Sequence, residues 1–512
     1  HSPYGYYSYS RANDRSIYAD IMANISKQWT DLSFIANIGS AFTHTSYDIT
    51  GFQGGLKPPS NLFTPNAIDY SRVSGDNRPI FDLTRHAIHS VLGSVELGWQ
   101  EKVYLTVTGR NDWDSSLSNT AQQSFFYPSV GMSAILSKML KLPAFVDFLK
   151  FRTSWASVGS AISPNISSAW RYEYIPSTGT YHTVTYKFPD NFYPERTNSL
   201  EAGVTATLFK EALSVKFTLY QSNTKNQTFL RQITLGGAYN REYIQAGNVR
   251  NRGLELTVGY NKKWTDSRWS VNMSYSMNHN RIVRLLDNPN ETLRQGGLNG
   301  CEVILTQGGT MGDLYTFTGF KRNQQGDIQV NADGQVMQIE LPTPRLVGSV
   351  LPKAHLGLNN TFSWKGLECR LLITARLGGV CVSQTQAFMD SYGVSQKTAT
   401  QRDNGGVVVG SQYVPTERYY TVVGGETPIW DEYVYDASNA RIKEVYLSYT
   451  FDKLIRGAKV SVALTARNLL MLYCKAPFDP EATPSTDIYY QGFDYFMQPS
   501  QRSLGFSINV KL

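Results

Sequence analysis

The sequence predicts an all-β protein, a transmembrane antiparallel β-barrel, on three observations. Residues 200–221 alternate strictly between apolar and polar side chains on both sides of a short turn at Lys210 and Glu211. Such alternation places successive side chains on opposite faces of a strand. Similar hairpins recur along the chain, and residues 504–512 end it within another amphipathic strand. Because a strand edge in a membrane must be paired, and a closed barrel leaves no edge, these patterns favour a barrel.

The composition indicates strands, not helices, as the spanning elements. The 512 residues are 41% apolar and 13% aromatic, with 32 tyrosines and 41 glycines. No run approaches the roughly 18 apolar residues that a membrane helix requires. The mean hydropathy of -0.31 suits strands that each carry one apolar and one polar face.

The charges, the missing motifs and the cysteines argue against several other classes. The net charge of +7 is spread along the chain without a Lys/Arg block, so no nucleic-acid partner is expected. We find no GxSxG, HExxH, glycine-rich phosphate loop or Cys/His pairing, and no enzyme is predicted. The cysteines lack zinc-site spacing and are expected to be free, packed thiols: Cys301, Cys369, Cys381 and Cys474.

Residues 331–334, Asn-Ala-Asp-Gly, resemble the start of a calcium-binding loop. They lack the full ligand pattern of such loops, and we interpret them as a turn. No cofactor is predicted, and a structural calcium ion at this turn is the alternative.

Strand-like segments follow one another along the chain. Their ranges are 17–29, 32–38, 91–99, 103–107, 128–137, 149–158, 200–208, 213–221, 254–260, 269–277, 356–364, 367–375, 445–451, 460–466 and 504–512. These are about fifteen strands of roughly 10 residues, the length that a tilted membrane strand requires.

Short turns alternate with long connections. Residues 30–31, 100–102 and 365–366 are tight turns, whereas 51–79 and 159–198 are long stretches without a periodic apolar face. In bacterial barrels the short turns face the periplasm and the long loops face outside. We expect the same polarity here.

Aromatic residues gather beside the short turns. In a barrel they would lie at the level of the lipid headgroups, and the alternative is ordinary packing in a sheet core. These residues are Trp29, Trp99, Phe209, Trp264, Trp269 and Trp364.

Several motifs occur in an order and spacing that is similar to a known family. They are TGRNDWDSSL (108–117), FYPSVGMSAILS (126–137), LKFRTSWASVG (149–159), PERTNSLEAGV (194–204), GNVRNRGLEL (247–256), DASNARIKEVYLSYTF (436–451), ARNLLMLYCKAPFDPE (466–481) and the closing RSLGFSINV. Each motif is weak alone. Together they resemble the SusC-like TonB-dependent outer-membrane transporters of Bacteroidetes.

This resemblance implies a barrel of about 22 strands, filled by an N-terminal plug, energised by TonB through a TonB box, and covered outside by a SusD-like surface lipoprotein. Within residues 1–512 we find no TonB box, plug-like sequence or signal segment, and too few strands for that barrel. We therefore expect residues 1–512 to be the C-terminal portion of an outer-membrane barrel with long extracellular loops. We expect no plug domain within residues 1–512, and the N-terminal plug and barrel portion of the same transporter would be their partner.

Aromatic residues in three long loops are the candidate contacts for a ligand or for the lipoprotein lid. Aromatic faces with polar neighbours suit sugar rings, peptide backbones or a docked partner, and they also suit packing of the loops on one another. The candidates are Trp170, Tyr172, Tyr174 and Tyr181 in the first loop, Tyr419, Tyr420, Trp430 and Tyr433 in the second, and Tyr490 and Phe493 in the third.

The leading interpretation is the barrel portion of an importer that moves oligosaccharides or oligopeptides across the cell outer membrane. Its surroundings would be outer-membrane lipid and lipopolysaccharide. One alternative is a passive porin or surface adhesin barrel, which needs no plug. Another is a secreted soluble β-propeller or glycan-binding protein, although the connectors vary too widely in length for a propeller repeat of about 40 residues.

Overall fold

The regular structure of the protein is almost entirely β-strand. The computed structural model describes residues 3–70, 78–118, 120, 122–163, 171–175, 180–184, 186–187, 192–232, 241–455, 457–485 and 489–511. Within these ranges one antiparallel sheet has 16 strands, and smaller sheets and three short helices accompany it. The prediction of an all-β fold is confirmed.

The large sheet follows the order of the sequence. Neighbours in the list are hydrogen-bonded: β1 (Tyr6–Gln28), β2 (Leu32–Gly55), β3 (Arg78–Trp99), β4 (Val103–Asp114), β5 (Ser124–Ile135), β6 (Val146–Ser160), β10 (Glu195–Leu208), β11 (Leu213–Gln232), β12 (Arg241–Lys263), β13 (Ser267–Arg284), β18 (Ala354–Trp364), β19 (Leu367–Leu377), β24 (Asn439–Ile455), β25 (Ala458–Cys474) and β27 (Ser503–Lys511). The short β9 (Tyr186–Lys187) pairs with the start of β12. One continuous strand order excludes a propeller of separate blades.

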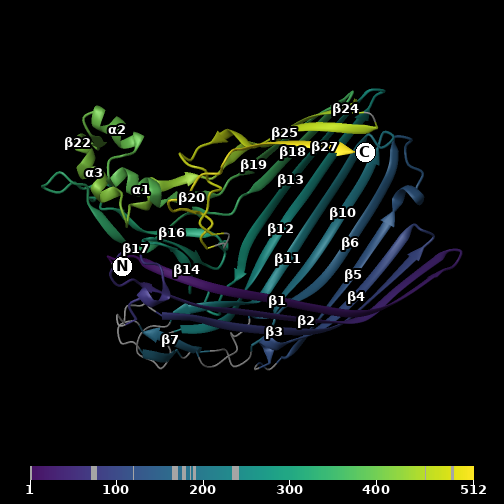
Figure 1. The fold of residues 1–512 in the computed structure, drawn as a ribbon, viewed down its shortest axis with the longest axis horizontal. Coiled ribbons are helices and arrows are strands. Elements are labelled where there is room, and N and C mark those ends of the chain that lie inside the picture. The colour runs from purple at the N-terminus through teal and green to yellow at the C-terminus, as the bar shows by residue number, and fades with distance from the viewer. Residues whose placement is uncertain are drawn as a thin grey trace. The chain divides into compact units, whose positions relative to one another are not determined.

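The first three strands are longer than the sequence predicted. β1, β2 and β3 have 23, 24 and 22 residues and lie side by side (Figure 1). The register runs without a shift from Tyr6 opposite Gly55 to Gln28 opposite Ser33. Backbone pairing thus continues through polar, Tyr-, Ser- and Thr-rich sequence beyond the apolar alternation, and the expected loop 51–79 begins only after Gly55.

The chain divides into two compact units. The first comprises His1–Ala134, Arg152–Leu200 and Ser222–Asn248, and the second comprises Ile135–Phe151, Glu201–Gln221 and Val249–Leu512. The first unit holds the ladder from β1 to β4 and nearly all of β5, and the second holds the ladder β13, β18, β19, β24, β25 and β27.

In the first unit the sheet has one apolar and one polar face. The register aligns exposed apolar side chains across β3, β4 and β5: Val95, Val107 and Val130 in one row, and Leu97, Leu105 and Met132 in the next. On the opposite face, the hydroxyls of Thr108 and Ser129 lie 2.6 Å apart, and Asn37 Nδ2 donates to Ser94 Oγ at 3.0 Å. Polar side chains therefore form hydrogen bonds with one another on the face opposite the apolar rows.

The second unit repeats this division. Leu447, Leu464 and Phe506 form an exposed row across β24, β25 and β27, with exposed fractions of 43%, 59% and 77%. On the other face, the hydroxyls of Thr450 and Ser461 lie 2.9 Å apart. Contiguous exposed apolar rows of this length are covered in a stable protein, and a lipid bilayer covers one face of a barrel sheet.

The aromatic residues beside the short turns are exposed, so they do not form a sheet core. The exposed fractions are 46% for Trp29, 50% for Trp99, 56% for Phe209, 47% for Trp264, 38% for Trp269 and 50% for Trp364. This is the placement expected of side chains at a membrane interface.

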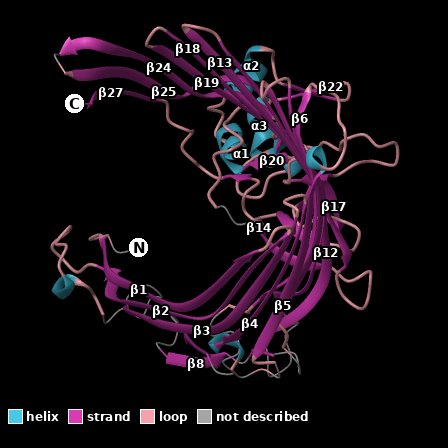
Figure 2. Cartoon of the chain, turned by 90° about the vertical axis from the view of Figure 1, so that its right-hand side faces the viewer, coloured by secondary structure: helices cyan, strands magenta, loops and turns pink. Residues whose placement is uncertain are grey.

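Between its sheet strands, the second unit carries a folded module that the sequence did not predict. We define the module as residues 293–349 and 380–436. Its elements are β14 (Leu293–Leu298), β15 (Cys301–Leu305), β16 (Asp313–Phe320), β17 (Gln338–Ser349), β20 (Val380–Ser383), α1 (Gln384–Ser391), α2 (Gln396–Asp403), β21 (Val407–Val409), β22 (Gln412–Val414), α3 (Thr416–Val423), the 3-10 turn η4 (Trp430–Tyr433) and β23 (Val434–Asp436). Figure 2 shows the three helices gathered beside β20.

The remaining elements are short. β26 (Phe493–Asp494) adds to β20 in parallel, and β7 (Arg171–Ile175) pairs with β8 (Thr180–Val184) in a hairpin. Single 3-10 turns are η1 (Pro65–Ala67), η2 (Ser115–Leu117) and η3 (Leu136–Lys138). In the described part of the chain, none of the helices is long and apolar enough to cross a membrane.

The two faces of the sheet should respond differently to a charge. We expect Val107→Arg to destabilise the folded protein in lipid by about 2–4 kcal/mol near the membrane midplane. Thr106→Arg is the matched control, because Thr106 lies on the polar face opposite Glu96, which can pair with the new guanidinium. Urea titration of the protein in lipid vesicles measures both, and equal costs at the two positions would contradict the assigned faces.

Candidate functional site

Serine caps fix the two helices at the start of the module's helical segment. Ser383 Oγ accepts a hydrogen bond from the Gln386 amide at 2.9 Å, and Ser395 Oγ accepts one from the Thr398 amide at 3.1 Å. Such caps satisfy amides that a helix start leaves without partners. Ser383 Oγ also donates to Asp494 Oδ2 at 2.6 Å, so the first cap joins α1 to β26.

Five of the aromatic residues predicted as ligand or lid contacts are buried. Their exposed fractions are 7% for Tyr419, 2% for Tyr420, 0% for Trp430 and Tyr433, and 2% for Phe493. These side chains pack the module and its junction with β26. Direct contact between them and a ligand would require the module to open.

Trp430 joins the helical part of the module to its four-stranded sheet. Its indole Nε1 donates to the backbone oxygen of Asn299 at 2.9 Å, and Thr318 Oγ1 donates to the oxygen of Pro428 at 2.6 Å. Gly300 has a φ of 80°, and a Cβ there would lie 3.2 Å from the indole nitrogen. A glycine at this position therefore lets the backbone approach the buried ring.

Tyr420 and Tyr433 surround the ammonium of Lys397. The Lys397 Nζ lies 5.4 Å and 5.7 Å from the two ring centroids. It also lies 3.9 Å from Asp390 Oδ2 and 3.8 Å from Glu432 Oε2. Burial, followed by the nearby charge of Asp390, raises the pKa of both tyrosine hydroxyls well above the ordinary value. The two rings stay neutral at physiological pH, and the cluster links α1, α2, α3 and η4.

The other predicted contacts have different positions. Tyr490 is 39% exposed, and its ring would touch a Cβ placed on Gly296 of β14. Tyr174 lies opposite Tyr181 in the β7–β8 hairpin, which also contains Tyr172. Trp170 lies outside the described residues. Of the candidates whose side chains are described, Tyr490 is the exposed one.

Exposed apolar side chains elsewhere on the module are not among the candidate contacts that the sequence analysis selected. Tyr392 and Val394, between α1 and α2, are 78% and 69% exposed. Val408 and Tyr413 lie opposite each other in the β21–β22 hairpin and are 60% and 67% exposed. Strands of three residues are too short for a visible alternation, so the sequence carried no periodic signal here.

The motifs that carried the family resemblance contact one another in space. In the first motif, Arg110 Nε lies 2.7 Å from Asp112 Oδ1, and the Tyr127 hydroxyl of the second motif donates to the same carboxylate. Asp114 Oδ1 accepts from the Ser116 amide at 2.8 Å and starts η2. These motif residues therefore organise the ends of β4 and β5.

A buried ion pair joins the two last long motifs. Arg441 on β24 donates from Nη2 to Asp479 Oδ1 at 2.7 Å and from Nη1 to Oδ2 at 3.2 Å. Ser500 Oγ donates to Asp479 at 2.6 Å. Burial alone would raise the pKa of Asp479, but the hydrogen bonds from Arg441, Ser500 and the Glu481 amide lower this pKa to about 2. The carboxylate is therefore ionised at neutral pH and holds the segment after β25 against β24.

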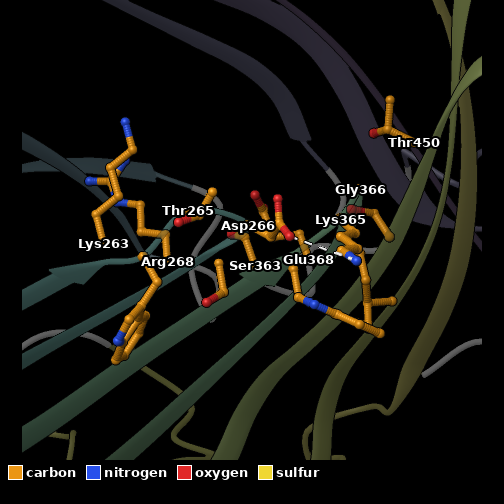
Figure 3. A pocket seen from close by; sticks show the side chains of 14 residues that line it. Lys263, Thr265, Asp266, Arg268, Ser363, Lys365, Gly366, Glu368 and Thr450 are labelled. Carbon is orange, nitrogen blue, oxygen red and sulfur yellow. Dashed lines mark ion pairs between the residues drawn. The ribbon is translucent and has the colours of Figure 1, made fainter.

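A pocket of about 430 Å³ lies at the short turns of β12–β13 and β18–β19 (Figure 3). Arg268, Ser363, Glu368 and Ser448 occupy one polar row of its wall, because they are cross-strand neighbours. The ammonium of Lys365 pairs with the carboxylate of Asp266 at 3.7 Å, as the dashed line in Figure 3 marks. The mixture of cationic and anionic groups suits a polar surface in water.

Two further features of the sequence can be located in the structure: residues 331–334 and the four cysteines. Residues 331–334 form a tight turn, in which the Gly334 amide donates to the Asn331 oxygen at 3.0 Å. The turn interpretation is thus confirmed, and calcium binding stays a prediction. Cys301, Cys369, Cys381 and Cys474 are free thiols, as expected.

The Arg441 and Asp479 pair should be strongly coupled. Arg441→Met leaves a buried carboxylate without its cation, and we expect a loss of about 3–5 kcal/mol in stability. The double variant Arg441→Met with Asp479→Leu should recover much of it. The stabilisation from Asp479 is full above its unfolded pKa of about 3.9 and disappears as the pH falls toward 2. Thermal unfolding from pH 7 to pH 2 measures both effects. If the loss of stability in the double variant equals the sum of the losses in the two single variants, the coupling is refuted.

Comparison with known proteins places the chain in a family. Residues 1–469 match the family model described as "TonB dependent receptor-like, beta-barrel". Two curated relatives come from Formosa agariphila. TonB-dependent receptor P3 is 24% identical over 492 residues, which cover 88% of this chain and 48% of the relative. TonB-dependent receptor P26 is 25% identical over 511 residues, which cover 90% and 48%. The chain spans about half the length of these relatives.

Solved structures share the fold. A structure of the RagAB peptide transporter superposes with a TM-score of 0.75 at 17% identity, and covers 98% of this chain and 55% of the transporter chain. The RagAB peptide importer in its "open-open" state superposes with a TM-score of 0.73 at 16% identity. From the match over residues 1–469, together with the two-faced sheet, the chain belongs to the TonB-dependent receptor-like β-barrel family.

Proposed function

We propose that this chain forms the barrel portion of a TonB-dependent, SusC-like importer in the bacterial outer membrane. The observation that carries the proposal is the two-faced sheet in a chain of the TonB-dependent receptor family. Its exposed apolar rows suit contact with lipid, and its hydrogen-bonded polar face suits a wet passage. An N-terminal plug and barrel portion would complete the transporter, and TonB would supply the energy.

A lipoprotein lid of the SusD type is the proposed partner of the module. The module presents Tyr392, Val394, Val408 and Tyr413, which are all more than half exposed. Aromatic side chains are enriched at protein interfaces, and an exposed apolar surface outside the membrane favours a protein partner. The name of the RagAB peptide transporter is consistent with a paired assembly of this kind.

The proposed cargo is an oligopeptide, with an oligosaccharide as the second candidate. The fold likeness to a structure named as a peptide transporter supports the first. The polar face offers hydroxyl and amide groups, such as the Asn251 Oδ1 that accepts from Asn278 and Asn280 at 2.9 Å and 3.0 Å. Such groups can bond to peptide backbones and to sugar hydroxyls alike. The passive porin and adhesin alternatives find no support in the family match.

The lid surface can be tested with exposed and buried tyrosines. In the intact transporter, we expect Tyr392→Ala with Tyr413→Ala to reduce co-purification of the lipoprotein, because exposed rings are removed from the module. Tyr70→Ala is the matched control, since Tyr70 is 50% exposed outside the module. Tyr433→Ala should instead destabilise the module by about 3–5 kcal/mol, as for other buried aromatic residues.

Mass spectrometry of the purified complex measures both the partner and any retained cargo. Peptides bound to a complex that contains a lipoprotein would support the proposal. Bound oligosaccharides would make an oligosaccharide, not an oligopeptide, the proposed cargo. An assembled barrel that binds no lipoprotein in its native membrane would contradict the proposed lipoprotein partner.

A further inference from the structure

Lys27 is a charged residue in an apolar row of the first unit. The strand register continues this row from Lys27 through Phe34, Leu97, Leu105 and Met132. A lysine in such a row is unfavourable in hydrocarbon unless its ammonium reaches the polar boundary of the membrane. Lys27 lies one residue before the end of β1, so its side chain is long enough to do so.

The ammonium of Lys27 lies over an exposed tryptophan at the turn. Its Nζ is 5.4 Å from the ring centroid of Trp29, which is 46% exposed. This is the distance of a cation–π interaction, which orients the ammonium but leaves N–H groups free to donate elsewhere. Among the described residues, Lys27 forms no salt bridge with a carboxylate.

The neighbouring turn has a similar lysine and tryptophan pair, in which Lys102 Nζ also donates one hydrogen bond to Gln100 Oε1 at 2.8 Å. Lys102 Nζ lies 6.0 Å from the centroid of Trp99, which is 50% exposed. Trp99 pairs with Leu32, and the Gln100 amide donates to the Asp31 oxygen at 2.7 Å, so the two turns are joined. The second unit contains a third pair, in which Lys365 Nζ lies 5.8 Å from the Trp364 centroid.

We propose that the pairs Lys27 with Trp29 and Lys102 with Trp99 form a binding site for the phosphate of an anionic phospholipid at the short-turn rim. The inference rests on the proposed membrane location of the sheet. The indole rings would lie at the headgroup level, where tryptophan is enriched, and the ammonium groups would donate to the phosphate oxygens. The exposed apolar rows directly beyond the turns would contact the acyl chains of the same lipid.

Charge and position favour a lipid over an acidic protein segment. Both lysines and both rings belong to the apolar side of the sheet or to the turns that border it, as their register shows. A soluble acidic segment would find complementary charge there but would also have to cover Leu32, Leu97 and Leu105, which are 39%, 38% and 39% exposed. A phospholipid supplies both the phosphate and the apolar chains.

The test compares lipid selection by the wild-type transporter with that of its lysine variants. The protein is incorporated into nanodiscs that contain equal amounts of phosphatidylglycerol and phosphatidylcholine, and native mass spectrometry counts the lipids retained by the protein. The wild type should enrich phosphatidylglycerol. In the double variant Lys27→Gln with Lys102→Gln, the enrichment of phosphatidylglycerol should fall, by at most about fivefold for each lysine removed. The variants Lys27→Arg and Lys102→Arg should keep it.

The matched control is Lys57→Gln with Lys225→Gln, which removes the same charge from exposed lysines outside the short turns. Unchanged enrichment in the Lys27 and Lys102 variant, or an equal loss in the control, would overturn the proposal. If a poly-glutamate peptide binds in a way that depends on Lys27 and Lys102, and no lipid is enriched, the ligand of this site is an acidic protein segment and the lipid proposal is wrong. Failure of every form to enter nanodiscs would instead contradict the proposed membrane barrel.

Discussion

The antiparallel register of the long strands is the constraint on which the rest of the structure depends. Because side chains alternate with a period of two, a slip by one residue would move every apolar side chain to the polar face. In β3, β4 and β5 the register places Val95, Val107 and Val130 in one row, and it places the hydrogen-bonded Thr108 and Ser129 on the other face. The proposed function depends on this separation, because the sheet of the proposed importer would contact lipid on one face and a polar passage on the other.

Local interactions at the strand ends support this register. Asp112 joins Arg110 to Tyr127 across β4 and β5, and Asp479 joins the segment after β25 to Arg441 on β24. Charged hydrogen bonds of this kind are shorter and stronger than neutral ones. The residues of the family motifs therefore have structural roles where strands end and loops begin, which is also where the chain must change direction.

The sequence predicted the hairpins well because their signal is local. Alternation and turn residues identified all of the long strands of the main sheet, including the pair around Lys365 and the final strand. Strand lengths were underestimated where pairing continues through polar residues. The module was not foreseen, because most of its strands have eight residues or fewer and its helices have eight residues each, too few for a clear period. The burial of Tyr420, Trp430 and Tyr433 depends on contacts between distant segments, and no local pattern reveals these.

The central claim, that alternate residues face lipid, is tested most directly by a spin-label scan of residues 103–108 in lipid vesicles. Each position is labelled in turn, and its accessibility to oxygen, which dissolves in the bilayer, is compared with that to a water-soluble nickel complex. We predict that oxygen accessibility is high at Val103, Leu105 and Val107 and that nickel accessibility is high at Tyr104, Thr106 and Thr108. Accessibility without a period of two, or with the opposite phase, would contradict the account.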